Sequence, residues 1–301
     1  MKHLLGIEDL TKEEIESLVE EAIQLKVDRG IVPGRPLRDE TWAMIFTKSS
    51  TRTRVSFEVG LNELGARPMF LSGNDVQLGR GEPIKDTARV LGRMVHGAII
   101  RTFDQQDVVD FAKYGEIPTI NALTDEEHPC QIIADLQTIR ERLGGWDGRK
   151  VVFFGDGDCN MGRSWAWAAK RLGFDLVIAA PKEFQPDEEF MTRLGEAPVS
   201  LTDDPKAAAE GADVLYTDTW VSMGKEAEAA DRLKILAPFQ VNESLLALAN
   251  DGAMVQHCLP AYRDKEITET LLEAHADAIF QEAENRLHAQ KAILVALARG
   301  R

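Results

Sequence analysis

The chain has 301 residues and a formal net charge of −15, with 44% hydrophobic and 28% charged residues. This length predicts about two domains, and the composition is typical of a soluble globular protein. The acidic balance argues against nucleic acid and anionic membranes as partners, because both attract basic surfaces. An anionic small molecule would need a local positive site, so clustered arginines are informative.

The N-terminal residues and the cysteines indicate the compartment. The first residues run directly into Glu8 and Asp9 and contain no apolar segment of the secretory kind. No apolar run approaches the ~18 residues that a membrane helix needs. Cys130, Cys159 and Cys258 are odd in number and widely spaced, so no disulfide framework is expected. We therefore expect a cytoplasmic protein.

The predicted elements of the first half alternate between helices and short strands. The first helix follows Thr11, which forms a capping box with Glu14, and it ends before Gly30. A long helix is predicted at Pro129–Leu143. Strands and helices alternate between these two helices at Thr41–Phe46, Thr53–Leu64, Pro68–Leu71, Lys85–Val95, Ala98–Arg101, Asp107–Tyr114 and Pro118–Ala122. This alternation predicts βαβ units and a parallel sheet.

The alternation restarts after a glycine-rich stretch at residues 144–148, which is the predicted domain boundary. A helix is predicted at Asn160–Leu172, and strands at Val151–Phe154, Leu176–Ala179, Val214–Thr217, Met254–His257 and Ala278–Phe280. We expect an α/β protein with two doubly wound parallel-sheet domains, residues 1–146 and 147–301, joined by interdomain helices. The final helix, from about residue 285, is a candidate to pack back on the first domain.

The first strand is followed by a cluster of hydroxyl and guanidinium groups, the sequence Ser50-Thr51-Arg52-Thr53-Arg54. Ligands of open α/β sheets bind at the carboxyl ends of the strands. A helix N-terminus there offers free N–H groups and a positive dipole to an anion. Hydroxyls and arginines at this point suit a phosphate. The alternative is a capped helix with solvated arginines.

Two further candidates depend more on context. His128 and Gln131 stand at the start of the long helix in His-Pro-Cys-Gln, where Pro129 is ordinary helix punctuation. Arg101 ends the predicted strand Gly97–Arg101. When each is considered alone, the simpler interpretation of the first is a capped helix with a surface histidine. The simpler interpretation of Arg101 is a solvated arginine.

A glycine-rich loop follows the strand Val151–Phe154. The segment from Gly155 to Gly162 resembles the dinucleotide fingerprint G-x-G-x-x-G, except that Asn160 replaces the third glycine. Asp175, about 20 residues beyond Gly155, fits the acid that binds a ribose, so a nicotinamide dehydrogenase is the alternative from another class. Against it, two carboxylates, Asp156 and Asp158, would meet the pyrophosphate and suit a cationic ligand better.

Two more strand ends carry polar residues. Asp218 follows a strand and is a natural partner for an amine, although it could instead cap a helix before a flexible Ser-Met-Gly loop. His257 and Cys258 end another strand, where sequence neighbours point to opposite faces and so do not form a dyad by adjacency. No second histidine or cysteine lies at ligand spacing, so we predict no metal site.

These motifs, in this order, resemble those of the ornithine carbamoyltransferases from about residue 40 to the last residue. Ser-Thr-Arg-Thr-Arg and His-Pro-x-Gln are similar to motifs of the whole aspartate/ornithine carbamoyltransferase superfamily. Asp-x-x-x-Ser-Met-Gly and His-Cys-Leu-Pro are similar to those of its ornithine branch. The resemblance implies transfer of a carbamoyl group from carbamoyl phosphate to the δ-amine of ornithine in arginine metabolism, without a cofactor. It also implies a homotrimer or an assembly of trimers.

The resemblance implies two sets of site residues. Carbamoyl phosphate would be bound by Ser50, Thr51, Arg52, Thr53, Arg101, His128, Gln131, Cys258, Leu259 and Arg286, with Gln77 reaching the site of a neighbouring subunit. Ornithine would be bound by Asn160, Asp218, Ser222 and Met223, with the Ser222-Met223-Gly224 loop as a lid between closing domains. The residues implied in catalysis, by stabilising the oxyanion or orienting the amine, are Arg101, His128, Asp218 and Cys258.

Other functions remain as alternatives to this interpretation. A carbamoyltransferase for putrescine or an N-acylated ornithine would share most motifs, but the Ser-Met-Gly loop fits a free α-amino acid. A catalytically silent binding paralogue is disfavoured, because every polar motif residue is present. The dehydrogenase remains the alternative from outside the class.

Overall fold

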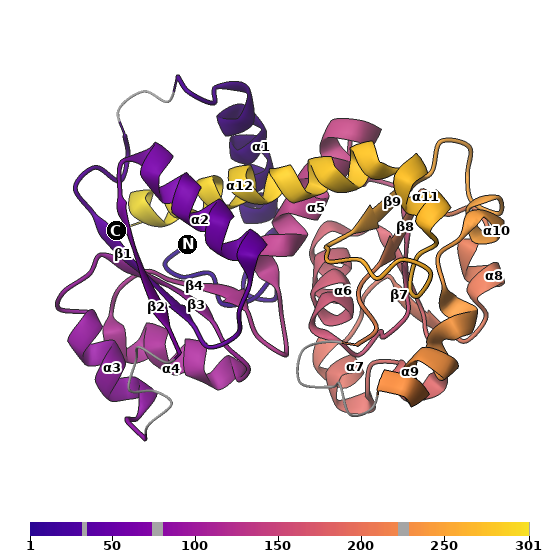
Figure 1. Ribbon diagram of the computed structural model, residues 1–301, viewed down its shortest axis with the longest axis horizontal. Helices are drawn as coiled ribbons and strands as arrows, with labels where there is room; N and C mark the ends of the chain where they lie inside the picture. Colours follow the sequence, from indigo (N-terminus) through magenta and orange to yellow (C-terminus); the bar gives the residue numbers. More distant parts are fainter. Residues whose placement is uncertain (32–34, 74–80, 222–228, 301) are drawn as a thin grey trace. The chain divides into compact units, whose positions relative to one another are not determined.

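The computed structural model describes residues 1–31, 35–73, 81–221 and 229–300. It divides into two compact units (Figure 1). Unit 1 comprises Met1–Gln137 and Glu284–Arg301, and unit 2 comprises Thr138–Ala283. The division therefore falls inside the helix α5 (Pro129–Leu143), a few residues before the glycine-rich stretch, and the C-terminal residues group with the first unit.

Unit 1 contains a four-stranded parallel sheet in the order β2-β1-β3-β4. Its strands are β1 (Thr41–Phe46), β2 (Arg67–Ser72), β3 (Gly97–Arg101) and β4 (Thr119–Leu123), and its helices include α1 (Lys12–Val27), α2 (Thr51–Leu64), α3 (Ile84–Leu91) and α4 (Gln105–Gly115). Ala43 and Ile45 of β1 pack against Ala88 of α3 and Phe111 of α4. Figure 1 shows α1 and α2 on the other face, so helices cover both faces of this sheet.

Unit 2 contains a five-stranded parallel sheet in the order β7-β6-β5-β8-β9. Its strands are β5 (Lys150–Phe154), β6 (Asp175–Ala179), β7 (Val199–Thr202), β8 (Val214–Thr217) and β9 (Met254–His257). On one face Leu215 packs with Ala208 and Leu271 of the helices, and on the other Trp165 meets Tyr216 at 5.2 Å between ring centroids. Its helices include α6 (Asn160–Leu172), η2 (Lys182–Phe184), α7 (Glu188–Leu194), α8 (Pro205–Ala209), α9 (Ala229–Leu236), η4 (Ala237–Phe239), α10 (Glu243–Leu246) and α11 (Glu269–Ala274).

The predicted fold class, an α/β protein with two parallel sheets, is confirmed. The capping box of Thr11 and Glu14 is also present. The strand predicted at Ala278–Phe280 is wrong, because these residues belong to the helix α12 (Ala276–Arg299). A short apolar run does not distinguish a strand from a buried helical segment, and no glycine or proline interrupts the sequence up to Arg299. The short strand β7 was not predicted.

The part of α12 beyond residue 283 packs in unit 1. A Cβ on Gly60 of α2 would lie 3.2 Å from the side chain of Lys291, so the two helices approach closely there. Lys291 is fully buried and its ammonium pairs with Glu63 at 2.7 Å. Within the described ranges, neither α12 nor any other helix is both long and apolar enough to cross a membrane.

Acid should destabilise unit 1 partly through His288, a fully buried residue of α12. Burial, followed by the charge of Lys291, lowers the pKa of His288 to about 4. Because the unfolded chain binds this proton near pH 6.5, stability should decline as pH falls from 6.5 toward 4. The slope for one full proton is about 1.4 kcal/mol per pH unit.

Urea unfolding of the wild type and of His288→Leu across this pH range tests this expectation. The variant should show a shallower decline, although His3, His128 and His275, whose pKa values are also lowered, and Glu284 beside His288 remain in both proteins. Parallel pH profiles for the two proteins would contradict the assignment.

Candidate active site

Each sheet has one place where the strand order reverses relative to the chain. In unit 1 the chain passes from β1 outward to β2 and then returns to β3 on the other side of β1. In unit 2 the strands β6 and β7 lie on one side of β5, and β8 and β9 on the other. Ligands of open α/β sheets bind beyond the carboxyl ends of the strands at such reversals. The predicted site residues follow these same strands.

The N-terminus of α2 lies just beyond β1 and is built around Ser50. The Ser50 hydroxyl accepts a hydrogen bond from the backbone N–H of Thr53 at 3.3 Å and donates to the Thr53 hydroxyl at 3.1 Å. The first turn of α2 contains no acidic residue, and Thr51 and Arg52 are exposed. The helix therefore presents its N–H groups and a guanidinium to an incoming anion.

The guanidinium of Arg286, a residue of α12, donates hydrogen bonds to the first turns of both α2 and α5. Its Nη2 donates to the Thr53 hydroxyl at 3.2 Å, and its Nη1 donates to the side-chain oxygen of Gln131. The Gln131 amide in turn donates to Asp135 at 2.7 Å. Because Arg286 is 4% exposed, its charge is held in a largely dry environment, where it acts strongly on a bound anion.

His128 lies within the influence of two guanidiniums. Burial, with added repulsion from Arg286 and Arg101, holds the pKa of His128 well below its ordinary value. At neutral pH the imidazole is therefore uncharged and can donate one hydrogen bond to a carbonyl oxygen. Unit 1 thus brings together the predicted residues Ser50, Thr53, Arg101, His128, Gln131 and Arg286.

Unit 2 brings together Asp218, which follows β8, and Cys258, which follows β9. The Cys258 thiol donates to Asp218 Oδ1 at 2.8 Å, and the backbone N–H of Thr219 donates to the same oxygen at 2.6 Å. Burial raises the pKa of Asp218, and the hydrogen bond from Cys258 partly opposes this rise. This arrangement places the Cys258 thiol as a hydrogen-bond donor beside a carboxylate, which suits the binding of an amine.

His257 and Cys258 have separate partners, as predicted from their strand geometry. The imidazole of His257 lies 3.3 Å from Glu266, and its Nδ1 accepts from the backbone N–H of Leu259 at 2.9 Å. Leu259 itself has a φ of 56°, a conformation that branched side chains rarely adopt. Such strain persists where the surroundings hold a residue in place, often at a functional site. No sequence signal pointed to Glu266.

The carboxylates of the glycine-rich loop require a correction. Asp156 pairs with Arg232, and Asp158 pairs with Arg163 at 2.8 Å. Both carboxylates are thus neutralised by arginines of the protein itself, and not by a cationic ligand as the sequence had suggested. Burial raises the pKa of the Cys159 thiol, and the charges of Asp156 and Asp218 raise it further, so the loop nevertheless lies near Asp218. Asn160 follows this cysteine as the first residue of α6. Asn160 is therefore the neighbour in sequence of Cys159, whose pKa the charge of Asp218 affects.

The glycines of the loop are accounted for by packing. A Cβ on Gly157 would lie 2.3 Å from a methyl group of Ile178, and a Cβ on Gly162 would lie 2.2 Å from the Gly157 carbonyl. A Cβ on Gly155 would lie 2.7 Å from the indole nitrogen of Trp220. At Gly157, the position of the second fingerprint glycine, protein atoms thus occupy the space that a dehydrogenase leaves for the pyrophosphate.

NAD and NADP should therefore leave the melting temperature unchanged at millimolar concentration. A ligand that binds only the native state raises the melting temperature by mass action. Carbamoyl phosphate in the same thermal-shift experiment is the positive control and should raise it. A dose-dependent shift with either dinucleotide would restore the dehydrogenase interpretation.

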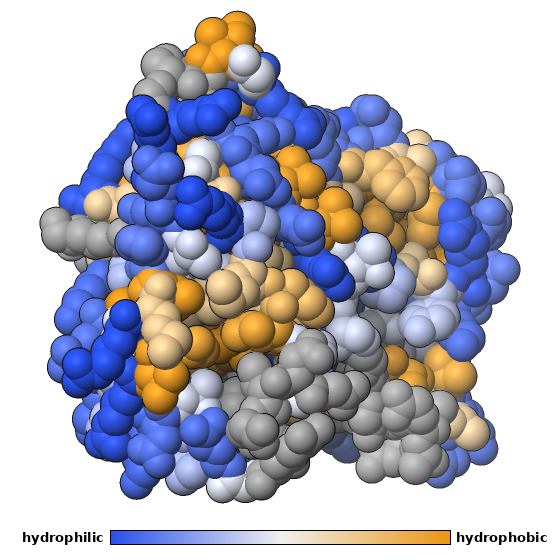
Figure 2. Space-filling view, turned by 60° about the vertical axis from the view of Figure 1, so that its left-hand side comes forward, coloured by the Kyte–Doolittle hydropathy of each residue, from blue (hydrophilic) through white to orange (hydrophobic). Residues whose placement is uncertain are grey.

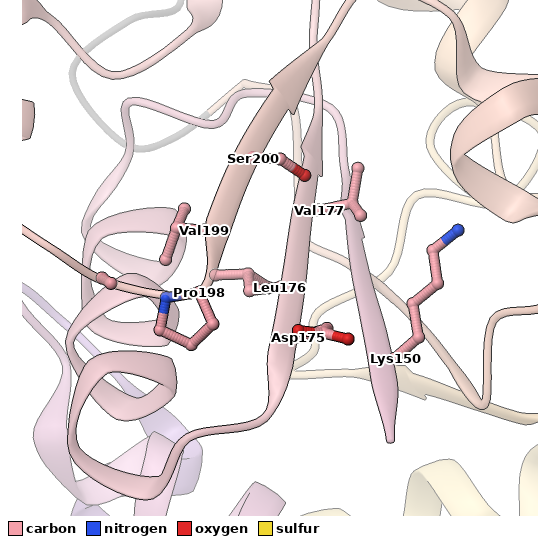
Figure 3. A pocket seen from close by; sticks show the side chains of 8 residues that line it. Lys150, Asp175, Leu176, Val177, Pro198, Val199 and Ser200 are labelled. Atoms are coloured by element: carbon pink, nitrogen blue, oxygen red, sulfur yellow. The ribbon is translucent and has the colours of Figure 1, made fainter. Parts of the chain in front are cut away.

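A shallow pocket of about 390 Å³ lies at the opposite ends of the strands of unit 2 (Figure 3). Lys150, Asp175 and Val199, the first residues of β5, β6 and β7, line it. None of the residues implied in binding carbamoyl phosphate or ornithine lines this pocket. Across the described ranges, no cluster of three or more histidine, cysteine, aspartate or glutamate side chains has the arrangement of a metal site.

Three predicted residues lie outside the described ranges. They are Gln77, Ser222 and Met223. The predicted Ser222–Gly224 lid lies outside them as well.

Two family models match the chain. Residues 2–141 match the carbamoyl-P binding domain of aspartate/ornithine carbamoyltransferases, and residues 147–297 match their Asp/Orn binding domain. The chain belongs to the aspartate/ornithine carbamoyltransferase family. A relative from Akkermansia muciniphila, named ornithine carbamoyltransferase, is 60% identical over 303 residues, covering 100% of this chain and 99% of the relative.

Solved structures of the same family resemble this fold along its whole length. The anabolic ornithine carbamoyltransferase of Campylobacter jejuni has a TM-score of 0.93 and 45% identity, with 100% of both chains covered. The ornithine carbamoyltransferase of Pyrococcus furiosus has the same TM-score and identity, with 100% of this chain and 98% of the other covered. These similarities place the chain in the ornithine branch of the family and identify it as a carbamoyltransferase enzyme.

Proposed function

We propose that this protein transfers the carbamoyl group of carbamoyl phosphate to the δ-amine of L-ornithine, giving L-citrulline and phosphate. The observation that carries the proposal is the convergence of Thr53, Arg101, His128 and Arg286 in unit 1. An acidic chain that concentrates buried guanidiniums at a helix N-terminus is equipped to bind a phosphate. Ornithine is proposed as the amine substrate because the similar proteins are named ornithine carbamoyltransferases.

The proposed carbamoyl phosphate site follows the strand ends of unit 1. The start of α2 binds the phosphate through Ser50, Thr51, Arg52 and Thr53, and Arg286 adds a second guanidinium. Arg101, His128 and Gln131 hold the carbamoyl end. The family resemblance also assigns Cys258 and Leu259 of unit 2 to this substrate. Arg101 and the neutral His128 donate hydrogen bonds to the oxyanion that forms when the amine attacks, and each such donor is worth on the order of 10²–10³ in rate.

The proposed ornithine site follows the strand ends of unit 2. Asn160, Asp218, Ser222 and Met223 bind the amino acid. The δ-ammonium must lose a proton before its nitrogen attacks the carbonyl carbon, after which the bond from carbon to the phosphate oxygen breaks. Asp218 and Cys258 orient the amine by charge and hydrogen bonding.

Assembly and cellular context are part of the same proposal. We propose a homotrimer in which Gln77 reaches a neighbouring phosphate site, with the first domain for carbamoyl phosphate at 1–146 and the second for ornithine at 147–301. Figure 2 shows hydrophobic residues gathered on part of the surface. Separately, the unit 1 residues Val55, Met69 and Met94 are 54%, 44% and 70% exposed. Apolar surface of this kind is typical of subunit contacts. We also propose that the protein is cytoplasmic and acts in arginine biosynthesis.

A citrulline assay with purified protein, carbamoyl phosphate and a panel of amines tests the proposed function. Ornithine should be turned over in preference to putrescine and N-acylated ornithine. A protein that is folded but forms no carbamoylated product from any amine would refute the proposal, and preference for another amine would replace the substrate.

A further inference from the structure

Lys48 is a buried charge that the motifs do not account for. It stands two residues before Ser50 and is 7% exposed. Its ammonium forms an ion pair with Asp125 and lies 4.3 Å from the ring centre of Phe103. Burying an ammonium costs free energy that one pair with an exposed carboxylate does not repay, whereas an apolar side chain would fill the same space without that cost. Stability therefore does not explain a lysine at this position.

The three residues of this contact belong to three different loops. Lys48 follows β1, Phe103 follows β3 and Asp125 follows β4. The backbone N–H of Asp125 also donates to the Phe103 carbonyl at 2.8 Å, so all three loops are tied together. Each loop adjoins part of the proposed carbamoyl phosphate site, namely Ser50–Thr53, Arg101 and His128.

We propose that Lys48 is a positioning residue that holds these three loops in register and so aligns the phosphate-binding groups with those that polarise the carbonyl. This inference rests on the proposed function. Its ammonium is committed to Asp125 and the ring of Phe103, so Lys48 acts on the substrate through the loops. Small misplacements of this kind can cost on the order of 100-fold in rate.

Steady-state kinetics and calorimetry on three variants test the role of Lys48. Lys48→Met, which keeps the volume and removes the pair, should lower kcat/KM for carbamoyl phosphate by about 10- to 100-fold. The KM for ornithine should stay within about twofold, since its proposed ligands lie in unit 2. Lys48→Arg should restore most of the loss. Lys291→Met removes another buried lysine paired with a carboxylate and controls for lost stability, so it should keep the wild-type kinetics of its folded fraction.

Asp125→Asn separates positioning from simple electrostatics. If Lys48 positions the loops, removing its partner should also weaken carbamoyl phosphate binding, and the double variant should be no worse than Lys48→Met. If Lys48 were only a positive charge near the phosphate, loss of the Asp125 carboxylate would strengthen binding instead. That result, or an unchanged kcat/KM in Lys48→Met, would overturn the inference alone. A wild type that neither binds carbamoyl phosphate nor forms citrulline would overturn the proposed function and this inference together.

Discussion

Arg52→Ala should weaken carbamoyl phosphate binding by about 2–4 kcal/mol, the loss expected for a charge-assisted contact made in two parallel hydrogen bonds. The Arg52 side chain is exposed at the first turn of α2 and makes no hydrogen bond or ion pair within the described part of the chain. It therefore has no structural task there, and the variant should keep the wild-type melting temperature. Isothermal calorimetry with the free enzyme measures the loss directly.

Arg54→Ala is the matched control for Arg52→Ala. Arg54 is two residues away and also exposed, but its guanidinium lies 3.8 Å from the ring centre of Phe70 and 3.5 Å from the Glu58 carboxylate. Because its charge is already engaged, its removal should change carbamoyl phosphate affinity far less. Equal affinity losses in the two variants would indicate a general field effect, and an unchanged affinity in a folded Arg52→Ala protein would contradict the proposed phosphate site.

Asp218→Asn should lower kcat/KM for ornithine on the order of 10²- to 10³-fold while leaving carbamoyl phosphate affinity unchanged. The carboxylate faces the Cys258 thiol and can attract the δ-ammonium before it loses its proton. An amide keeps the shape but removes the charge. Initial rates at varied ornithine, with carbamoyl phosphate held saturating, measure the effect.

Two further variants sharpen this test. Asp213→Asn removes a structural carboxylate of unit 2, which pairs with Arg149 at 3.2 Å, and should cost stability while sparing ornithine kinetics. Cys258→Ser keeps a donor to Asp218 and should lower kcat/KM substantially, but less than Asp218→Asn does. A Cys258→Ser protein that is destabilised but fully active per folded molecule would reduce Cys258 to a small packing residue. Asp218→Asn kinetics equal to those of Asp213→Asn would remove Asp218 from the proposed mechanism.

Sequence reasoning located the strand ends well because each carries a local pattern. The strands β1, β8 and β9 and the helices α5 and α6 have the predicted bounds, since apolar runs and helix starts are local signals. The partners of the polar residues were not predictable in the same way. Arg232 neutralises Asp156 from 76 residues away, and no pattern in the sequence relates the two.

The same limit applies to the contacts of Lys48. Its pairing with Asp125 depends on β1 and β4 ending at the same edge of one sheet, which is a property of the strand order. Motif comparison singled out Arg286 as a site residue but not its hydrogen bonds to Thr53 and Gln131. The polar residues at strand ends can thus be identified from the sequence. Which charged side chains pair with one another can be identified only from the three-dimensional structure.

The position of Arg286 in the chain has a consequence for biosynthesis. The guanidinium that bonds to Thr53 is translated only after every residue of unit 2. Until α12 has been translated, the N-terminal turns of α2 and α5 lack their shared cation. Competence for carbamoyl phosphate should therefore appear late, after α12 leaves the exit tunnel. A stalled chain ending before residue 284 should not retain the phosphate ligand, whereas the full-length chain should.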